Sequence, residues 1–344
     1  MNHQSRFLSS EERRQFEAEK PSELKHADIW MISGCQDVQC SADISNTHGF
    51  ELPDPAGKAS GACTATLLHV LYEYEKNPWK EYTFADVMDK MRQVLKQKGF
   101  QQVPQLTSTR PISLGETQFK IVPDQYQELS NATKRAVLIG INYKGHKKGE
   151  LFGCHNDAFN MYNYIQDFYG FQDQDVAVLA DDGDHPLPTK AAILQAYHHV
   201  VAVSKPGDSI FLHYSGHGTK VKDLNGDEDD GYDEALMPVD FKTAGVILDD
   251  DLYDIFVKGL KPGVHVVALF DCCHSGTMLD LPYIFKANGE YSKMEIDRGS
   301  NQFNKLLGKF AGGKMLFGNM KNLKMIKKLG GGKMVNGFIK QIMK

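Results

Sequence analysis

Between residues 135 and 285 the chain alternates short apolar runs with longer segments whose apolar residues recur at helical spacing. Four runs that are almost wholly apolar predict strands: RAVLIGINY, DVAVLAD, SIFLHYSG and HVVALFD. The segments between them, at 156–170, in TKAAILQAYHHVVAVS and in LDDDLYDIFVKGL, predict helices. Apolar strands that alternate with helices are typical of a parallel sheet covered on both faces. Ligands of such sheets bind beyond the carboxyl ends of the strands.

A first folded region precedes this alternation. ADIWMISG at 27–34 predicts a short buried strand, and apolar residues at helical spacing predict helices at 60–77 and 83–100. The second helix has Thr83 as its expected N-cap and Gly99 as its expected C-cap. QVPQL and TQFKIV are short strand candidates. Both helices carry an apolar stripe that must pack against something, so we expect this region to extend the same sheet.

The composition, with 41% hydrophobic and 24% charged residues in a chain of 344, is that of a soluble globular protein large enough for a substantial α/β core. No apolar run reaches the roughly 18 residues of a membrane-spanning helix. The polar start lacks the apolar core of a secretory signal. Six cysteines without a CxxC pair or framework spacing predict reduced thiols and a cytoplasmic protein, and argue against a zinc or thioredoxin-type site.

The formal net charge of −5 is unevenly distributed. Residues 223–254 hold twelve Asp or Glu and one Lys, whereas residues 305–344 hold ten Lys and no acid. The acidic block could bind a cation or a basic substrate, and the basic tail could bind an anionic surface or partner. Solvated loops explain either block almost as well, so charge alone does not decide between these interpretations.

Two predicted strands end in residues that suit catalysis. SIFLHYSGHGT places His217 between glycines, and HVVALFDCCHSGT ends with Cys272 and Cys273. A cysteine nucleophile needs a neighbouring base, because a free thiol with a pKa of about 8.5 is mostly protonated at neutral pH. The backbone amides of Gly218 and Cys273 could form an oxyanion hole. Geometry alone favours Cys273 over Cys272 only slightly.

HYSGHG and DCCHSG, together with AVLIGINY, GCHNDAFNM, MPVDF and ILDDDL, resemble the motifs of the caspase–haemoglobinase clan, and most closely those of metacaspases. WMISGCQDVQCSAD, GACTATLLHVL and QVPQL resemble the metacaspase small-subunit region. The resemblance implies a caspase-like three-layer α/β sandwich with a mainly parallel central sheet. It also implies that His217 is the catalytic histidine and Cys273 the nucleophile, with Cys272 and His213 as neighbours.

The order of the two regions departs from most metacaspases, because the small-subunit-like region comes first. This order resembles the circularly permuted type III metacaspases, and permutation is plausible because chain ends of compact domains often lie close together. The expected division is a polar leader at 1–26, a small-subunit-like region at 27–122, a linker at 123–134, a large-subunit-like catalytic region at 135–285, and a basic Gly-, Lys- and Met-rich tail at 286–344.

The expected substrate side chain is basic. No arginine occurs between residues 136 and 297, so the catalytic region cannot clamp an acidic substrate residue with arginine. The resemblance places four residues around the pocket for the residue before the scissile bond: Cys154, Asp157, Ser215 and Asp271. Two carboxylates there favour Arg or Lys. Two alternatives stay open: Asp157 could only cap its own helix, and Arg110 from the first region could reverse the preference.

The resemblance also implies calcium ligands, namely Asp233, Asp249, Asp250 and Asp280. Calcium takes six to eight oxygen ligands, so several carboxylates that converge suit it. A solvated acidic loop followed by a capped helix at 248–251 is the alternative. DLNGDEDDGYDE (223–234) has an EF-hand-like spacing of oxygen side chains but lacks the glycine at the sixth position, which argues against an EF-hand.

The sequence therefore predicts a calcium-stimulated cysteine endopeptidase that cuts after Arg or Lys with a Cys–His dyad. We expect protein or peptide substrates, a monomer and no nucleic-acid partner. One alternative is a legumain-like peptidase that cuts after Asn, which the acidic pocket disfavours. The other is a calcium-responsive interaction protein with a vestigial site, which the intact His217 and Cys273 motifs disfavour.

Overall fold

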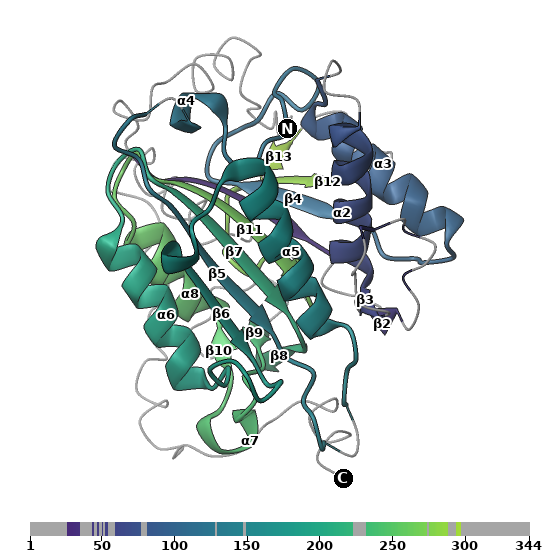
Figure 1. The fold of residues 1–344 in the computed structure, drawn as a ribbon, viewed down its shortest axis with the longest axis vertical. Coiled ribbons are helices and arrows are strands. Elements are labelled where there is room, and N and C mark those ends of the chain that lie inside the picture. Colours follow the sequence, from purple (N-terminus) through teal and green to yellow (C-terminus); the bar gives the residue numbers. More distant parts are fainter. Residues whose placement is uncertain are drawn as a thin grey trace, which may run out of the picture.

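A computed structural model describes residues 26–34, 43–44, 47, 50, 52–53, 59–76, 81–127, 129–146, 149–222, 232–273, 275–287 and 294–296. Its centre is an eight-stranded sheet (Figure 1). In spatial order the strands are β13 (Glu295–Ile296), β12 (Tyr283–Lys286), β4 (Gln105–Ser108), β1 (Asp28–Ser33), β11 (His265–Asp271), β7 (Ser209–Ser215), β5 (Lys134–Gly140) and β6 (Val176–Ala180).

The sheet joins the two folded regions of the chain. β1 from the first region pairs in parallel with β11, and the parallel order continues through β7, β5 and β6. On the other side of β1, β4, β12 and β13 pair in antiparallel fashion. β1 is fully buried because it lies between two strands and under helices on both faces. The expectation that the first region extends the catalytic sheet is therefore confirmed.

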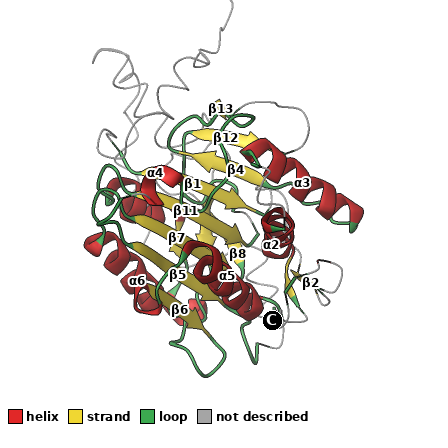
Figure 2. Ribbon diagram, turned by 45° about the horizontal axis from the view of Figure 1, so that its top comes forward, coloured by secondary structure: helices red, strands yellow, loops and turns green. Residues whose placement is uncertain are grey.

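Helices cover both faces of the sheet, as the alternating pattern predicts. α2 (Ala62–Glu75), α3 (Phe84–Gln97) and α5 (Cys154–Tyr169) pack on one face, and Figure 2 shows α2 and α5 side by side over it. The other face is covered by α6 (Lys190–Val203) and by α8 (Asp249–Leu252), which continues into a π-helical turn at Tyr253–Lys258. This is a caspase-like three-layer α/β sandwich, as the sequence predicts.

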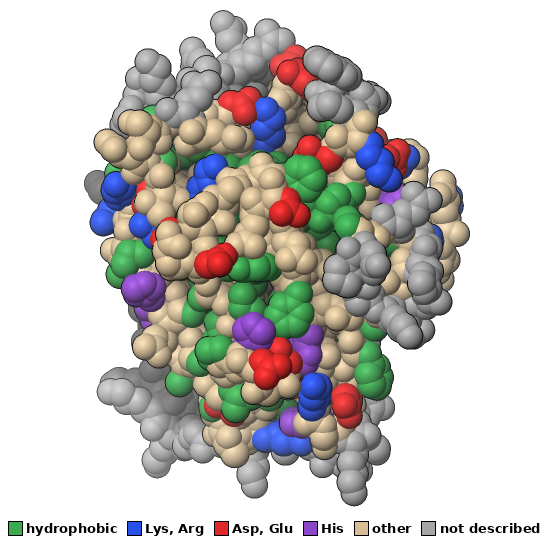
Figure 3. Space-filling view, viewed as in Figure 1, with side chains coloured by type: hydrophobic (Ala, Val, Ile, Leu, Met, Phe, Trp, Pro, Cys, Tyr) green, Lys and Arg blue, Asp and Glu red, His purple; other side chains and the backbone are tan. Residues whose placement is uncertain are grey.

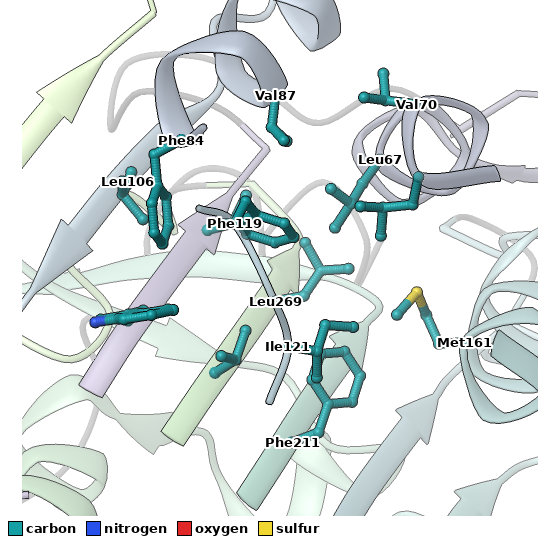
Figure 4. Packing of buried hydrophobic residues seen from close by; sticks show 14 of the residues in the cluster. Leu67, Val70, Phe84, Val87, Leu106, Phe119, Ile121, Met161, Phe211 and Leu269 are labelled. Atoms are coloured by element: carbon teal, nitrogen blue, oxygen red, sulfur yellow. The ribbon is translucent and has the colours of Figure 1, made fainter. Parts of the chain in front are cut away.

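Successive side chains of a strand point to opposite faces of the sheet, so each strand contributes to the two hydrophobic cores. Ile29 and Met31 of β1 point to the α6 side, and Trp30 and Ile32 point to the side of α2, α3 and α5. Figure 4 shows the second core, in which Phe84, Leu67 and Met161 from three helices converge over the sheet. Truncation of such a fully buried side chain typically costs about 2–5 kcal/mol. The core thus holds the two regions together as one unit.

Smaller elements complete the fold. They are the hairpin β2 (Asp43–Ile44) and β3 (Ser60–Gly61), the three-stranded sheet of β8 (Gly218–Lys222), β9 (Tyr232–Leu236) and β10 (Ile247–Leu248), and the short helices α4 (Asp124–Gln127), η3 (Asp173–Asp175) and α7 (Phe241–Ala244). β8 and β9 emerge directly beyond the end of β7. They therefore lie at the edge of the main sheet where the predicted catalytic residues fall.

Local predictions are confirmed in most places and wrong in two. Thr83 caps α3 through a capping box with Asp86, and Gly99 has a φ of 83° just past the helix end. TQFKIV does not form a strand, since its pairing is a single bridge between Gln118 and Thr83. LDDDLYDIFVKGL is not one regular α-helix, because the α-helical turn gives way to the π-helical one after Leu252.

Several predicted features lie outside the described residues: the leader up to residue 25, most of the acidic loop (223–231), the segment 35–42 and the tail from 297. Within the described part of the chain, no helix is long and apolar enough to cross a membrane. On the face seen in Figure 3, the described Lys and Arg side chains are scattered among acidic ones and form no continuous basic patch.

Candidate active site

The predicted catalytic residues follow two adjacent strands. β7 and β11 pair in parallel with Ser215 opposite Asp271, so the loops that carry His217 and Cys273 leave the sheet at the same edge. Gly218 lies against the backbone of Cys273: a Cβ added there would be 2.0 Å from the Cys273 carbonyl oxygen. Only glycine permits this approach, which explains the residue after His217.

The two neighbouring thiols differ in accessibility. Cys273 is partly exposed, whereas Cys272 is 0% exposed and packs in the core on the α6 side. A nucleophile must reach a substrate carbonyl, so the accessible thiol of Cys273 suits that role. The four cysteines in the described part of the chain, which are Cys63, Cys154, Cys272 and Cys273, are not disulfide-bonded.

His217 is held at two points by the loop that follows β5. Its Nε2 lies 2.6 Å from the carbonyl oxygen of Gly149, and its backbone N–H donates to the Tyr143 hydroxyl over 2.9 Å. A carbonyl can only accept, so Nε2 carries the hydrogen and Nδ1 keeps the lone pair. Burial lowers the pKa of His217 below 6.5. The imidazole is therefore a neutral base at physiological pH.

His213, two residues before the end of β7, has a different environment. It is fully buried, and its Nε2 lies 3.3 Å from the hydroxyl of Thr64 in α2. Burial lowers the pKa of His213 to about 3, so it stays neutral at any physiological pH. Its position beneath α2 is that of a packed neighbour.

The expected substrate-pocket residues are brought together. Asp157 accepts the Ser215 hydroxyl at 2.6 Å, and both Asp157 and Asp271 approach the Cα of Gly61. Asp157 also accepts the Gly61 N–H and the Ser60 hydroxyl. The Asp157 carboxylate thus bonds to the first region and to β7, so the alternative that it only caps its own helix is wrong.

Asp271 accepts the backbone N–H of Thr64 at 2.7 Å, in the first turn of α2. Both carboxylates are buried, and this burial together with the charge of Asp271 raises the pKa of Asp157 well above its usual range. Cys154, the fourth expected pocket residue, is a buried first residue of α5, and its N–H donates to the Asn142 side chain. The residues expected around the substrate pocket therefore make contacts that join both regions of the chain.

Arg110 does not reach this pocket. It pairs with Asp28 at the start of β1, with Nη2 2.8 Å from Oδ2. Asp28 is opposite His265, the first residue of β11, whereas the pocket lies beyond the last residue of that strand. The separation along the strand is about 20 Å. The alternative in which Arg110 reverses the preference for basic side chains is therefore not supported.

The predicted calcium ligands lie near the same edge. Asp249 and Asp280 are both nearly fully buried, and the Asp249 carboxylate accepts the backbone N–H groups of Glu234 and Asp250. Burial, with the nearby charges of Asp280 and Glu234, raises the pKa of Asp249 to about 10. These buried acids would repel one another if all were ionised, which suits a cation.

The remaining two expected ligands lie on β9 and α8. Asp233 is a buried residue of β9, and Asp250 is partly exposed in α8. Within the part of the chain that the structure describes, no group of three or more His, Cys, Asp or Glu side chains is arranged to hold a metal ion. The donor chemistry fits calcium, but the four carboxylates do not form a completed cage.

The groups that hold the predicted residues in place were not predicted from the sequence. The Gly149 carbonyl and the Tyr143 hydroxyl hold His217, and Ser60, Gly61 and Thr64 hold the pocket carboxylates. Most of these contacts are made by backbone groups. Almost every residue type has a backbone carbonyl and N–H, so the sequence does not mark the ones that bind a side chain. The short polar run before α2 was the one available signal, since SG directly precedes a helix start.

A partly exposed thiol and a neutral imidazole, carried on the loops after two adjacent strands at the carboxyl edge of a caspase-like sheet, are the arrangement typical of cysteine peptidases. The family model "Caspase domain" matches residues 4–113, and "Metacaspase, peptidase C14 domain" matches residues 134–282. The chain is 54% identical over 305 residues to "Metacaspase III c" of Phaeodactylum tricornutum, covering 88% of each chain. The chain belongs to the metacaspase family.

Fungal relatives match over a shorter span. Identity is 45% to "Metacaspase-1" of Ajellomyces capsulatus, covering 58% of this chain and 56% of that one. It is 47% to "Metacaspase-1" of Sclerotinia sclerotiorum, covering 52% and 43%. The chain thus spans about half the length of these two relatives. As a metacaspase it is a cysteine peptidase, a hydrolase that acts on peptide bonds of protein substrates.

Proposed function

We propose that this metacaspase is a calcium-stimulated endopeptidase that cuts after Arg or Lys, using Cys273 as nucleophile and His217 as base. The observation that carries the proposal is the juxtaposition at the sheet edge. Cys273 is accessible, its backbone lies against Gly218, and the neighbouring His217 is fixed by the Gly149 carbonyl.

The bond from Nε2 to Gly149 leaves His217 Nδ1 to accept the Cys273 thiol proton. The thiolate then attacks the substrate carbonyl, and the backbone N–H groups of Gly218 and Cys273 stabilise the oxyanion. The imidazolium returns its proton to the departing amine, so the peptide bond breaks and a thioester remains. Water, deprotonated by the same imidazole, hydrolyses the thioester and regenerates the thiol.

The acidic pocket supports specificity for basic residues. Asp157 and Asp271 are buried side by side, and a substrate guanidinium or ammonium would relieve their mutual repulsion. No arginine occurs between residues 136 and 297 to favour an acidic side chain instead, and Arg110 is bound to Asp28. A substrate Asn, as in legumain-like cleavage, would leave the two carboxylates without a cation.

Asp233, Asp249, Asp250 and Asp280 would hold the calcium ion. What supports this is the burial of Asp249 and Asp280 close enough to repel. When bound, the cation supplies positive charge that lets these acids ionise together. Asp280 lies seven residues after Cys273 and has a φ of 46°, so a change in its position would act on the loop of the nucleophile.

The test is hydrolysis of fluorogenic peptides that end in Arg, Lys, Asn or Asp, each with calcium and with excess chelator. We expect cleavage after Arg and Lys, stimulated by calcium and only weakly by magnesium, which requires tighter octahedral geometry. Cys273→Ala should abolish hydrolysis, and Cys272→Ala should keep most of it. Faster cleavage after Asn or Asp, or activity in Cys273→Ala, would contradict the assignment.

A double variant tests the proposed calcium site. Asp249→Ala/Asp250→Ala should remove the stimulation by calcium while the protein keeps its thermal unfolding transition. The same calcium response in this variant and in the wild type would show that the cation acts elsewhere. Correct folding with no hydrolysis of any peptide would favour the alternative, an interaction protein with a vestigial site.

A further inference from the structure

The loop between β5 and α5 determines where His217 lies. Tyr143 and Gly149, near its two ends, provide the hydroxyl that accepts the His217 backbone N–H and the carbonyl that binds Nε2. The rings of Tyr143 and His217 also lie 4.7 Å apart between centroids. A displacement of Tyr143 or Gly149 would therefore disturb the position of the imidazole.

The loop has an unfavourable backbone conformation at its key residue. Tyr143 has a φ of 53°, and among the described residues only Asp280 is another non-glycine residue with a positive φ. For a bulky side chain this left-handed conformation is strained, and it persists only where surrounding contacts impose it. Hydrogen bonds to the backbone on the two sides of Tyr143 are contacts of this kind.

One carboxylate provides both contacts. Asp181, the residue after β6, accepts the backbone N–H of Asn142 through Oδ1 at 2.8 Å and that of Lys144 through Oδ2 at 3.0 Å. These two N–H groups flank Tyr143. A single rigid carboxylate that bridges them fixes the peptide planes on either side and thereby the left-handed turn between them.

The Asp181 carboxylate is itself held by a histidine of α5. It is 8% exposed, and its Oδ1 lies 2.6 Å from Nε2 of His155 in α5. Burial alone would raise its pKa, but the hydrogen bonds from His155 and from the two backbone N–H groups hold the pKa of Asp181 below its usual value. The carboxylate is therefore ionised at neutral pH and accepts all these bonds at once.

We propose that Asp181 is a positioning residue for catalysis: it bridges the N–H groups that flank Tyr143 and so holds the loop that orients His217. The proposal rests on the proposed role of His217 as the base. Asp181 acts through Tyr143, whose hydroxyl accepts the His217 backbone N–H.

The neighbouring Asp182 is a matched control. It has the same side chain, one position further along, but its carboxylate accepts the backbone N–H groups of Asp184 and His185 within its own turn. Asp181→Asn retains one accepting oxygen and turns an NH2 group toward a backbone N–H. We expect kcat for an Arg peptide to fall about 10–100-fold with KM within about twofold, because a displaced base slows the chemical step. Asp182→Asn should keep kcat within about twofold.

A double-mutant cycle tests the route through Tyr143. Tyr143→Phe removes the hydroxyl that binds His217, so its loss of kcat should overlap with that of Asp181→Asn. In the Tyr143→Phe background we expect Asp181→Asn to reduce kcat less than about threefold. Fully multiplicative losses, a loss confined to KM, or equal effects of the Asp181 and Asp182 variants would each overturn the proposal.

Failure of this proposal is distinguishable from failure of the proposed function. Activity in Cys273→Ala, measured in the same assay, would refute the Cys–His mechanism whatever Asp181 does. If Cys273→Ala is inactive and Asp181→Asn equals Asp182→Asn, only the positioning role is wrong. Should Asp181→Asn fail to fold, His155→Gln decides: it should lower kcat about 2–5-fold, and an unchanged kcat would overturn the proposal.

Discussion

The two ends of the central sheet both join the first region to the catalytic one through buried charged groups, and they use opposite charge arrangements. At the amino end of β1, Asp28 meets Arg110 and His265. At the carboxyl end of β11, Asp271 meets a second acid, Asp157, across the first turn of α2.

The pKa values express this contrast. Burial would raise the pKa of Asp28, but His265 and Arg110 hold it well below its usual range. At the other end, burial and the charge of Asp271 raise the pKa of Asp157 well above its usual range. We call the first cluster complete, because opposite charges pair in it, and the second incomplete, because two acids meet in it. The complete cluster suits a role in stability, and the incomplete one supports the proposed binding of a basic substrate side chain.

The largest expected effect comes from breaking the complete cluster. Arg110→Met leaves Asp28 fully buried with its main cationic partner removed, which should lower the free energy of unfolding by about 3 kcal/mol. Because the pKa of Asp28 is depressed in the folded state, its contribution is present above the unfolded value of about 4 and is lost as the pH falls toward the folded value. Chemical denaturation at neutral pH measures the change.

Lys120→Met is the control for that variant. Lys120 pairs with Asp124 beside the same cavity as Arg110. Lys120 is partly exposed and Asp124 is exposed, so loss of this pair should cost less than about 1 kcal/mol. Hydrolysis by folded Arg110→Met should match the wild type, since the pair lies at the opposite end of the sheet from Cys273. A loss of activity without a loss of stability would contradict the division of roles between the two ends.

The second largest expected effect is a loss of cleavage after Arg when one carboxylate of the incomplete cluster, the Asp157–Asp271 pair, is neutralised. Asp271→Asn should lower kcat/KM for Arg peptides on the order of 10²-fold, because the substrate cation loses a buried partner. The same variant should unfold at a denaturant concentration close to that of the wild type, since it also removes a like-charge repulsion with Asp157. A large destabilisation with unchanged specificity would mean that Asp271 serves α2 and not the substrate.

The apolar runs predicted the four strands of the catalytic region, and the family resemblance of two motifs implied that Cys273 is the nucleophilic thiol, because both signals are local in the sequence. The sequence could not place Arg110, whose partner Asp28 is 82 positions away. It also could not show that backbone N–H groups at the start of α2 donate to Asp157 and Asp271, or that Tyr143 adopts a positive φ. Such features depend on tertiary contacts between backbone groups, which leave no pattern in residue types.

The smallest expected effect is a difference in pH dependence between two reactions, one that depends on His217 alone and one that also depends on Asp157. Alkylation of Cys273 by iodoacetamide needs no cation pocket and requires neutral His217 to take the thiol proton. Burial lowers the pKa of His217, so the neutral form persists and the acid limb of alkylation should have its midpoint below pH 6.5. Cleavage of an Arg peptide also needs ionised Asp157, whose pKa is raised, so the acid limb of kcat/KM should contain a second ionisation that displaces it upward from the alkylation limb. Both profiles, measured on one preparation, give the pH difference between their acid limbs.

Asp157→Asn should abolish this difference, because the acid limb of kcat/KM would then move down to that of alkylation. Coincident acid limbs in the wild type would show that ionisation of Asp157 does not limit cleavage.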